Sequence, residues 1–249
     1  MIKDLKIISL VPSLTELLVD LGLEENIVGI TKFCVHPKNL RKDKVVVGGT
    51  KNIHLKKIKD LQPDFILCNK EENTKEIVEN CRKIATTHVS DICTIKDIIA
   101  LIAYYGTLFS CEEKALALTK ELQDKIKDFK HFVKDKPTLK VVYFIWKNPW
   151  MIAANNTFIN HLLELTKLEN CYKSKSRYPE ITLEDLRTKE IDAIFLSSEP
   201  FPFKEKNNLD FKNHKENTNI VLVNGEYFSW YGSRLLKAFD YFKELRKRL

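Results

Sequence analysis

The sequence has few of the residues that mark common nucleotide-binding, disulfide-rich and membrane-spanning proteins. It has seven glycines in 249 residues, and none of them forms a GxGxxG or a P-loop pattern, which excludes a glycine-rich phosphate-binding loop. Its six cysteines form no CxxC pair, so we expect reduced thiols and neither a zinc ribbon nor a disulfide scaffold. No apolar run reaches the ~18–20 residues that a membrane-spanning helix needs, so no transmembrane segment is expected.

The N-terminus lacks the features of a secretion signal. Residues 1–12 have no basic segment followed by an uninterrupted apolar core and a small-residue cleavage site. We therefore expect a cytoplasmic protein if Met1 is the native start, and a periplasmic one if a leader has been removed.

The overall composition is that of a soluble globular protein, with 44% hydrophobic and 30% charged residues. The 41 basic residues exceed the 34 acidic ones by seven. Because the lysines look scattered, we attribute this surplus mainly to solubility and expect no nucleic-acid partner.

Short apolar segments alternate with helical patterns along most of the chain. Such alternation indicates parallel strands joined by helical crossovers, because parallel neighbours cannot be linked by a tight turn. A capping box at Ser13–Glu16 predicts the start of the first helix. The predicted strands are residues 6–10, 27–31, 64–68, 140–145, 192–196 and 220–223.

The middle of the chain has a different character. Residues 95–136 have a helical pattern and predict a connector between an N-terminal α/β lobe, 1–94, and a C-terminal one, 137–249. A weak repeat supports two related halves, because Leu55-x-x-Ile58 and Asp64 recur 128 positions later as Leu183-x-x-Leu186 and Asp192. We therefore predict an α/β fold of two Rossmann-like lobes with mostly parallel sheets, joined by a long helical connector. We expect the protein to be a monomer.

Several segments carry a resemblance to a known family. They are Ile8-Ser9-Leu10-Val11-Pro12-Ser13-Leu14-Thr15-Glu16-Leu17, Val28-Gly29-Ile30-Thr31, Gly48-Gly49, Leu61-Gln62-Pro63-Asp64-Phe65-Ile66, Asn148-Pro149, Ser176-Arg177-Tyr178-Pro179 and Gly225-Glu226-Tyr227-Phe228. Their order resembles that in the helical-backbone substrate-binding proteins of ABC importers, and most of all in the vitamin B12-binding branch.

The resemblance implies binding without catalysis. The ligand would be a metal-containing cofactor or metal chelate, namely a corrinoid, a haem or a ferric siderophore, held in a cleft between the lobes as cargo and not as a catalytic cofactor. The protein would be the substrate-binding component of an ABC-type uptake system, with an ABC permease as partner, or an intracellular relative.

The same resemblance implies the site residues. The ligand-binding residues would be Pro12, Ser13, Lys32, Phe33, Cys34, His36, Gly49, Thr50, Lys51, Trp146, Trp150, Phe228, Trp230, Tyr231 and Arg234. Exposed carboxylates would dock the permease, with Glu72 and Glu205 as the candidates and Glu71 and Glu76 nearby.

The aromatic and basic residues of these loops fit a ligand site on their own chemistry. Trp146, Trp150 and Trp230 follow predicted strands, where loops and not core are expected, and indole rings stack on planar ligands. The alternative is that the tryptophans close the end of the lobe. Five basic residues on the same loops would attract carboxylate or phosphate groups, or would form a solvated rim. They are Lys32, Lys51, Lys147, Arg177 and Arg234.

Cys34 and His36 leave several interpretations open, one of which is contact with a bound metal chelate. A thiolate and an imidazole two residues apart are candidate metal ligands, although two ligands make an incomplete site and no metal site is assigned. The pair could instead be structural. A further hypothesis is an intracellular enzyme in which His36 activates a Cys34 nucleophile.

Overall fold

The computed structural model describes residues 5–211 and 218–249, and it contains two compact units. Unit 1 comprises Met1–Gln123 and Tyr231–Leu236, and unit 2 comprises Asp124–Trp230 and Lys237–Leu249. The long helix α6 (Glu112–Val133) therefore belongs to both units, and a short C-terminal segment returns to unit 1. The predicted division at 94 and 136 stays a prediction.

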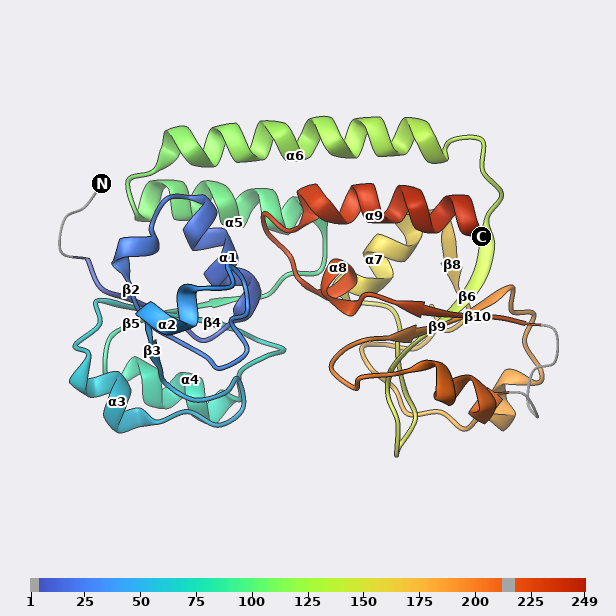
Figure 1. Cartoon of the computed structure of the whole chain (residues 1–249), viewed down its shortest axis with the longest axis horizontal. Helices are drawn as coiled ribbons and strands as arrows, with labels where there is room; N and C mark the ends of the chain where they lie inside the picture. Colours follow the sequence, from blue (N-terminus) through green and yellow to red (C-terminus); the bar gives the residue numbers. More distant parts are fainter. Residues whose placement is uncertain (1–4, 212–217) are drawn as a thin grey trace. The chain divides into compact units, whose positions relative to one another are not determined.

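Unit 1 contains a five-stranded parallel sheet with the order β3-β2-β1-β4-β5. Its central strands are apolar and buried, as expected for strands that are covered on both faces. Figure 1 shows α3 and α4 on one face of this sheet and α1 and α5 on the other. The strands are β1 (Ile7–Ser9), β2 (Ile27–Ile30), β3 (Val45–Val46), β4 (Phe65–Asn69) and β5 (Thr86–Ser90).

The helices of unit 1 are short apart from α5 and α6. They are α1 (Pro12–Asp20), η1 (Glu24–Asn26), α2 (Leu40–Asp43), α3 (Leu55–Asp60), α4 (Lys75–Arg82) and α5 (Ile95–Leu108). Within one face of the sheet, Ile58 of α3 and Cys81 of α4 pack against Ile8 and Ile66 of the central strands. This apolar layer fixes α3 and α4 against the sheet.

The capping box that the sequence predicts at Ser13–Glu16 is wrong. The predicted box makes Ser13 the N-cap, but helix α1 begins two residues earlier, with Val11 as its N-cap and Pro12 as its first residue, and Val11 makes no side-chain hydrogen bond. Proline is favoured at the first helical position because its missing N–H would have no partner there. The Glu16 carboxylate is therefore free of a capping role and forms an ion pair with Arg234.

Unit 2 contains a second five-stranded sheet with the order β10-β9-β6-β7, and β8 pairs with β6. All of its pairings are parallel except that between β6 and β7, which form a hairpin. The strands are β6 (Leu139–Trp146), β7 (Met151–Ala153), β8 (Leu168–Asn170), β9 (Ala193–Ser197) and β10 (Asn219–Val223).

The two faces of this sheet have separate apolar layers. Phe144 and Leu196 pack with Leu186 and Phe211 on one face, whereas Tyr143 contacts Phe228 on the other. The helices of unit 2 are α7 (Phe158–Leu165), η2 (Glu184–Leu186), η3 (Glu205–Phe211), α8 (Gly225–Ser229) and the part of α9 (Leu235–Arg248) that follows Leu236.

The repeat seen in the sequence has a structural counterpart. In unit 1, Asp64 precedes β4, and its carboxylate accepts a hydrogen bond from the Lys6 backbone N–H at 2.8 Å. In unit 2, Asp192 precedes β9 and accepts from the Lys140 backbone N–H at 2.6 Å. The same residue type thus aligns the start of two neighbouring parallel strands in both units.

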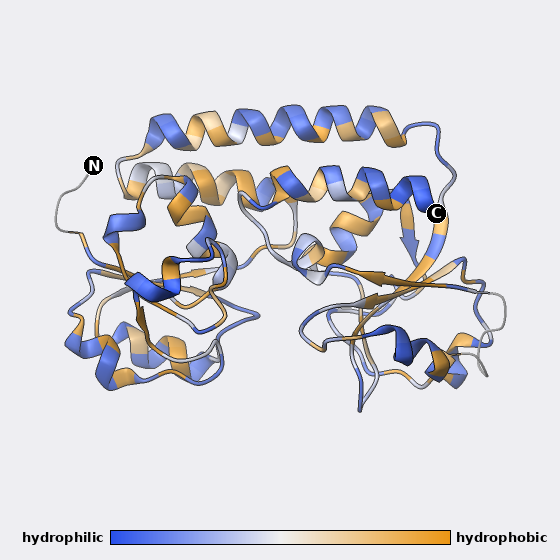
Figure 2. Cartoon of the chain, viewed as in Figure 1, coloured by the Kyte–Doolittle hydropathy of each residue, from blue (hydrophilic) through white to orange (hydrophobic). Residues whose placement is uncertain are grey.

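Hydropathy follows the layers of both units. Figure 2 shows the sheet strands largely in the hydrophobic colour, whereas α6 is mainly hydrophilic with a narrow apolar stripe. No helix among residues 5–211 and 218–249 is long and apolar enough to cross a bilayer. All six cysteines are free thiols, as the sequence predicts.

Candidate functional site

The loops that follow the strands of unit 1 contain the predicted ligand-binding residues of the N-terminal half. Pro12 and Ser13 come after β1, Lys32 and Phe33 after β2, and Thr50 after β3. Because all five strands are parallel, these loops lie at one edge of the sheet, the carboxyl edge, where open α/β folds bind ligands. The structure therefore brings together residues that are nearly 40 positions apart in the chain.

Buried amide side chains connect these loops. The Asn73 side-chain amide donates to the backbone carbonyl of Thr50 at 3.0 Å and to that of Leu10 at 3.4 Å. The Asn69 amide donates to the backbone carbonyl of Ser90 at 3.0 Å. These hydrogen bonds span the ends of four strands, so the carboxyl edge of unit 1 is a preorganised surface.

Phe33 is an exposed aromatic platform on this edge. Its side chain is 48% exposed, and the ring lies against the Gly49 backbone, where a Cβ would be 3.2 Å from the ring. The Lys32 ammonium lies 5.0 Å from the ring centroid. Gly48, with φ at 124°, turns the chain so that this contact is possible.

Glu72 contributes a half-buried carboxyl group to the same edge. Burial raises the pKa of Glu72 above its usual value, whereas the Lys51 ammonium and a hydrogen bond from Thr50 oppose that rise. The Lys51 ammonium also donates to the backbone carbonyl of Glu71 at 2.5 Å. The carboxyl group therefore sits within a hydrogen-bonded cluster, a surrounding that the sequence reasoning missed. Its predicted role in docking stays a prediction.

Tyr231 joins the edge from the far end of the chain. Its hydroxyl lies 3.2 Å from the Ser90 hydroxyl and forms a second hydrogen bond with Ser13. Burial raises the pKa of the Tyr231 phenol, with the Glu72 charge adding to the rise, so the phenol stays neutral at physiological pH. The edge thus exposes the ammonium groups of Lys32 and Lys51 and the ring of Phe33, whereas the hydroxyl groups of Thr50 and Tyr231 are buried.

Arg234 has a partner inside unit 1. Its guanidinium donates to both carboxylate oxygens of Glu16, at 2.7 and 3.0 Å, and both side chains are buried. A bidentate pair of this kind joins the returning C-terminal segment to α1. Because the guanidinium is already held by Glu16, contact of Arg234 with a ligand stays a prediction.

Cys34 is not placed to act as a nucleophile. Its sulfur is fully buried and lies 3.1 Å from the Thr15 hydroxyl and 3.3 Å from that of Thr31. Burial raises the pKa of the Cys34 thiol, so the reactive thiolate is disfavoured. His36 is half-buried on the loop that follows, and the side chains that hydrogen-bond to the sulfur are Thr15 and Thr31. The enzyme hypothesis therefore lacks the thiol–imidazole pair on which it depends.

A complete metal site is not evident either. Within the part of the chain that the structure describes, no three His, Cys, Asp or Glu side chains form a group that could hold an ion. Cys34 and His36 as metal ligands stay a prediction.

In unit 2, the predicted aromatic residues have different surroundings. Trp146 ends β6, is 39% exposed, and contacts the Phe201 ring edge to face at 5.8 Å. Trp150 is half-buried against Phe144 and Phe211 in the core, as in the alternative that a tryptophan closes the lobe. Phe228 has no exposed surface.

Trp146 and Phe201 form an accessible aromatic pair in unit 2. Phe201 follows β9 just as Trp146 ends β6, so both lie at the carboxyl ends of adjacent parallel strands. The sequence reasoning missed Phe201, although Pro200 and Pro202 mark its segment as a loop. Trp230 is buried and follows α8.

The remaining charged candidates are dispersed. Lys147 pairs with Asp210 at 2.5 Å and lies 5.2 Å from the Trp150 ring centroid. Arg177 is half-buried in the loop after β8, and Glu205 is exposed at the start of η3. Glu71 is half-buried after β4, whereas Glu76 is exposed in the first turn of α4.

Comparison with known proteins places this architecture. The profile of the family described as periplasmic binding protein matches residues 7–220. An uncharacterized ABC transporter substrate-binding lipoprotein of Bacillus subtilis is 26% identical over 197 residues, which are 76% of this chain and 62% of that relative, so the match spans less than two thirds of its length. A vitamin B12-binding protein of Pectobacterium atrosepticum is 25% identical over 240 residues, or 94% of this chain and 85% of the relative.

A solved structure has the same fold across the whole chain. The periplasmic heme-binding protein of Roseiflexus sp. RS-1, in its apo form, superposes with a TM-score of 0.84 at 14% identity and covers 98% of both chains. The predicted α/β fold class is confirmed.

Proposed function

The chain belongs to the periplasmic binding protein family, and from that membership we propose that it captures a metal-containing cofactor or metal chelate without chemical conversion. The ligand classes are a corrinoid, a haem or a ferric siderophore. The proposal is supported by relatives named for vitamin B12 binding and heme binding. A corrinoid is the first ligand to test, because the vitamin B12-binding relative aligns with 94% of the chain.

The observation that carries the proposal is the preorganised carboxyl edge of unit 1. Phe33 offers a flat apolar surface, and Lys32 and Lys51 offer positive charge to carboxylate or phosphate groups on the ligand. Thr50 and Tyr231 are buried, and their hydroxyl groups form hydrogen bonds with the neighbouring Glu72 and Ser90 side chains that help to fix this edge. These groups can bind and orient a polar, partly planar molecule. Trp146 and Phe201 offer a comparable aromatic surface in unit 2.

The same relatives support a proposal for where the protein acts and what it acts with. We propose that the protein acts outside the cytoplasmic membrane as the substrate-binding component of an ABC-type uptake system, as a monomer that delivers its ligand to a permease. The cytoplasmic alternative has no support among the relatives, whose names describe periplasmic proteins and a lipoprotein. The absence of catalysis is part of the proposal, and the buried Cys34 thiol supports it.

Titration of the intrinsic tryptophan fluorescence tests the proposal. The purified protein is titrated with cobalamin, haem, ferric siderophores and bare divalent metals, with correction for ligand absorbance. We expect saturable quenching by one chelate class, because Trp146 is exposed at the carboxyl end of β6. The proposal would be contradicted if none of these ligands gave a saturable fluorescence response and calorimetry also detected no binding.

A matched pair of lysine variants locates the ligand. Lys51 donates to Glu71 at the carboxyl edge, whereas Lys56 is exposed on α3 without a side-chain hydrogen bond among the described residues. We expect Lys51→Gln to weaken ligand binding by about tenfold. A hydrogen bond to a charged group contributes about 1.5–3 kcal/mol, and the glutamine amide retains part of that contact. Lys56→Gln should leave affinity unchanged. Equal affinities for both variants would place the ligand elsewhere.

A further inference from the structure

The positive charge of the protein is concentrated in one segment. Residues 31–60 contain nine basic and two acidic residues, a surplus of seven, which equals the surplus of the whole chain. The other 219 residues contain 32 basic and 32 acidic residues and are neutral. The lysines are therefore not scattered evenly, contrary to the first interpretation of the sequence. The nine cations are Lys32, Lys38, Arg41, Lys42, Lys44, Lys51, Lys56, Lys57 and Lys59.

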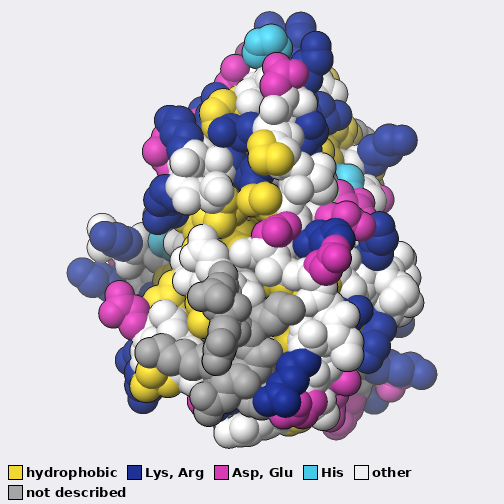
Figure 3. All heavy atoms as spheres, turned by 90° about the vertical axis from the view of Figure 1, so that its right-hand side faces the viewer, with side chains coloured by type: hydrophobic (Ala, Val, Ile, Leu, Met, Phe, Trp, Pro, Cys, Tyr) yellow, Lys and Arg dark blue, Asp and Glu magenta, His cyan; other side chains and the backbone are white. Residues whose placement is uncertain are grey.

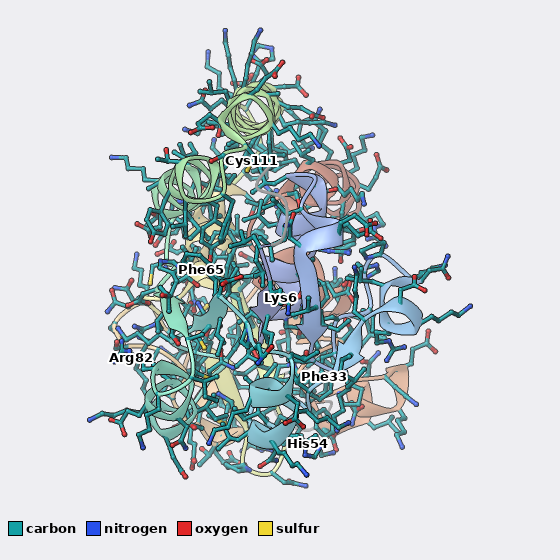
Figure 4. All side chains as sticks on the ribbon, turned by 90° about the vertical axis from the view of Figure 1, so that its left-hand side faces the viewer. Lys6, Phe33, His54, Phe65, Arg82 and Cys111 are labelled. Atoms are coloured by element: carbon teal, nitrogen blue, oxygen red, sulfur yellow. The ribbon has the colours of Figure 1, made fainter. Side chains whose placement is uncertain are left out.

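This segment folds as one piece around the edge strand of the unit 1 sheet. Strand β3 pairs only with β2 in the sheet order, with α2 before it and α3 after it. The Arg41 guanidinium donates to the Lys32 carbonyl at 2.9 Å, and the Lys57 ammonium donates to the Val46 carbonyl at 3.3 Å. Figure 4 labels Phe33 and His54, which both belong to this segment. We call the exposed surface of residues 31–60 the basic surface.

The cations of the basic surface form no ion pair with the residues that the structure describes. Eight of the nine are exposed, and no carboxylate oxygen of the described residues lies within 4.0 Å of any of the nine. Elsewhere, lysines such as Lys70, Lys125 and Lys173 pair with carboxylates at 2.5–2.8 Å. In the face of Figure 3, which lies at the unit 2 end, blue and magenta side chains are intermingled. The uncompensated charge thus produces a positive potential over one region of unit 1.

We infer that the basic surface binds the anionic headgroups of a lipid membrane. Eight of its nine cations are lysines, which act as point charges, whereas recognition of individual phosphates in nucleic acid favours the bidentate fork of arginine. Clusters of four to eight basic residues are sufficient for attraction to anionic lipid. Val45 on β3 is 41% exposed among these cations and offers an apolar contact at the headgroup level. This inference does not depend on the proposed ligand.

Sedimentation with lipid vesicles tests the inference. We expect the full chain to bind phosphatidylglycerol vesicles at low ionic strength and not to bind phosphatidylcholine vesicles. Added salt should release the protein from the anionic vesicles, because it screens the charges. The test variant is Lys38→Glu with Lys42→Glu and Lys56→Glu, which avoids the candidate ligand site. The affinity of this variant for the vesicles should be roughly 100-fold lower than that of the wild type, because each of the three lysines contributes about fivefold.

A control variant with the same net charge separates a local surface from a general charge effect. Lys120, Lys127 and Lys130 are exposed on α6, outside the basic surface, and their joint change to Glu should leave vesicle binding within about twofold of wild type. Equal losses in both variants would overturn the inference. Failure of the wild type to bind anionic vesicles would also overturn it, and retention on single-stranded DNA would then identify a nucleic-acid partner.

Discussion

At the scale of single residues, buried polar groups determine how unit 1 is held together. Glu16 lies on α1 and Arg234 lies 218 positions later, yet their side chains form a buried bidentate pair. Removing one partner from such a pair lowers the free energy of unfolding strongly, because the other charge remains buried without compensation. Replacing both partners by apolar side chains lowers it far less.

We expect Arg234→Leu to reduce the free energy of unfolding by about 3–5 kcal/mol. The double variant Glu16→Leu with Arg234→Leu should be more stable than this single variant, because it leaves no buried charge. Urea unfolding followed by circular dichroism measures both. The single variant Glu16→Leu is measured in the same way, and if the double variant lost the sum of the two single losses, the pair would not be coupled in the way we describe.

His88 is the residue whose titration we expect to affect stability. It lies on β5, where its Nδ1 is 3.0 Å from the Tyr105 hydroxyl and its ring is 4.9 Å from that of Tyr104. Burial lowers the pKa of His88 from the ordinary value of 6.5. The unfolded chain therefore takes up a proton first as the pH falls. The contribution of neutral His88 to stability is complete above about pH 6.5 and is lost as the pH falls toward the folded pKa.

The measurement compares the free energy of unfolding at pH 7.5 and pH 5 for the wild type and for His88→Gln. We expect the wild type to lose more stability between the two pH values than the variant, which cannot take up the proton. The prediction fails if the two proteins lose the same amount.

At the scale of elements, a side-chain cap marks the start of α5 at Ile95, the residue at which the helical pattern of the sequence also begins. Thr94 caps α5 in a complete capping box, in which the Asp97 backbone N–H donates to the Thr94 hydroxyl and the Asp97 carboxylate accepts from the Thr94 backbone N–H. The box predicted at Ser13 fails because Pro12 already begins α1 and Glu16 pairs with Arg234. A local motif is therefore decisive only where no tertiary contact competes for its side chains.

We expect Thr94→Ala to destabilise unit 1 by about 1 kcal/mol through loss of the cap. Thr107→Ala, an exposed position inside the same helix, serves as the matched control and should be neutral or slightly stabilising, because alanine is the better helix former. Thermal or urea unfolding of the two variants measures the difference. Equal destabilisation by both would argue against a capping role.

At the scale of the whole molecule, alternating strands and helices in the sequence correctly predict two parallel-dominated α/β sheets. Strand β5 was missed because Thr86–Ser90 is an edge strand with a polar sequence and half-exposed side chains. The prediction that the ligand is held between the two halves stays a prediction. Pro12, Ser13, Lys32, Phe33 and Thr50, which the family resemblance implied as site residues, lie after strands of unit 1, and their role in ligand binding stays a prediction.

The sequence by itself determined the fold class, the free thiols, and the loops that follow the strands of unit 1, because these depend on local patterns of apolar residues and on composition. Only the tertiary structure decided which side chains are accessible. In the folded chain, Cys34 and Phe228 are buried, whereas Phe33 and Trp146 are exposed. Arg234 forms an ion pair with Glu16. The reason is physical: burial and ion pairing depend on contacts between residues far apart in the chain, and local periodicity carries no information about those partners.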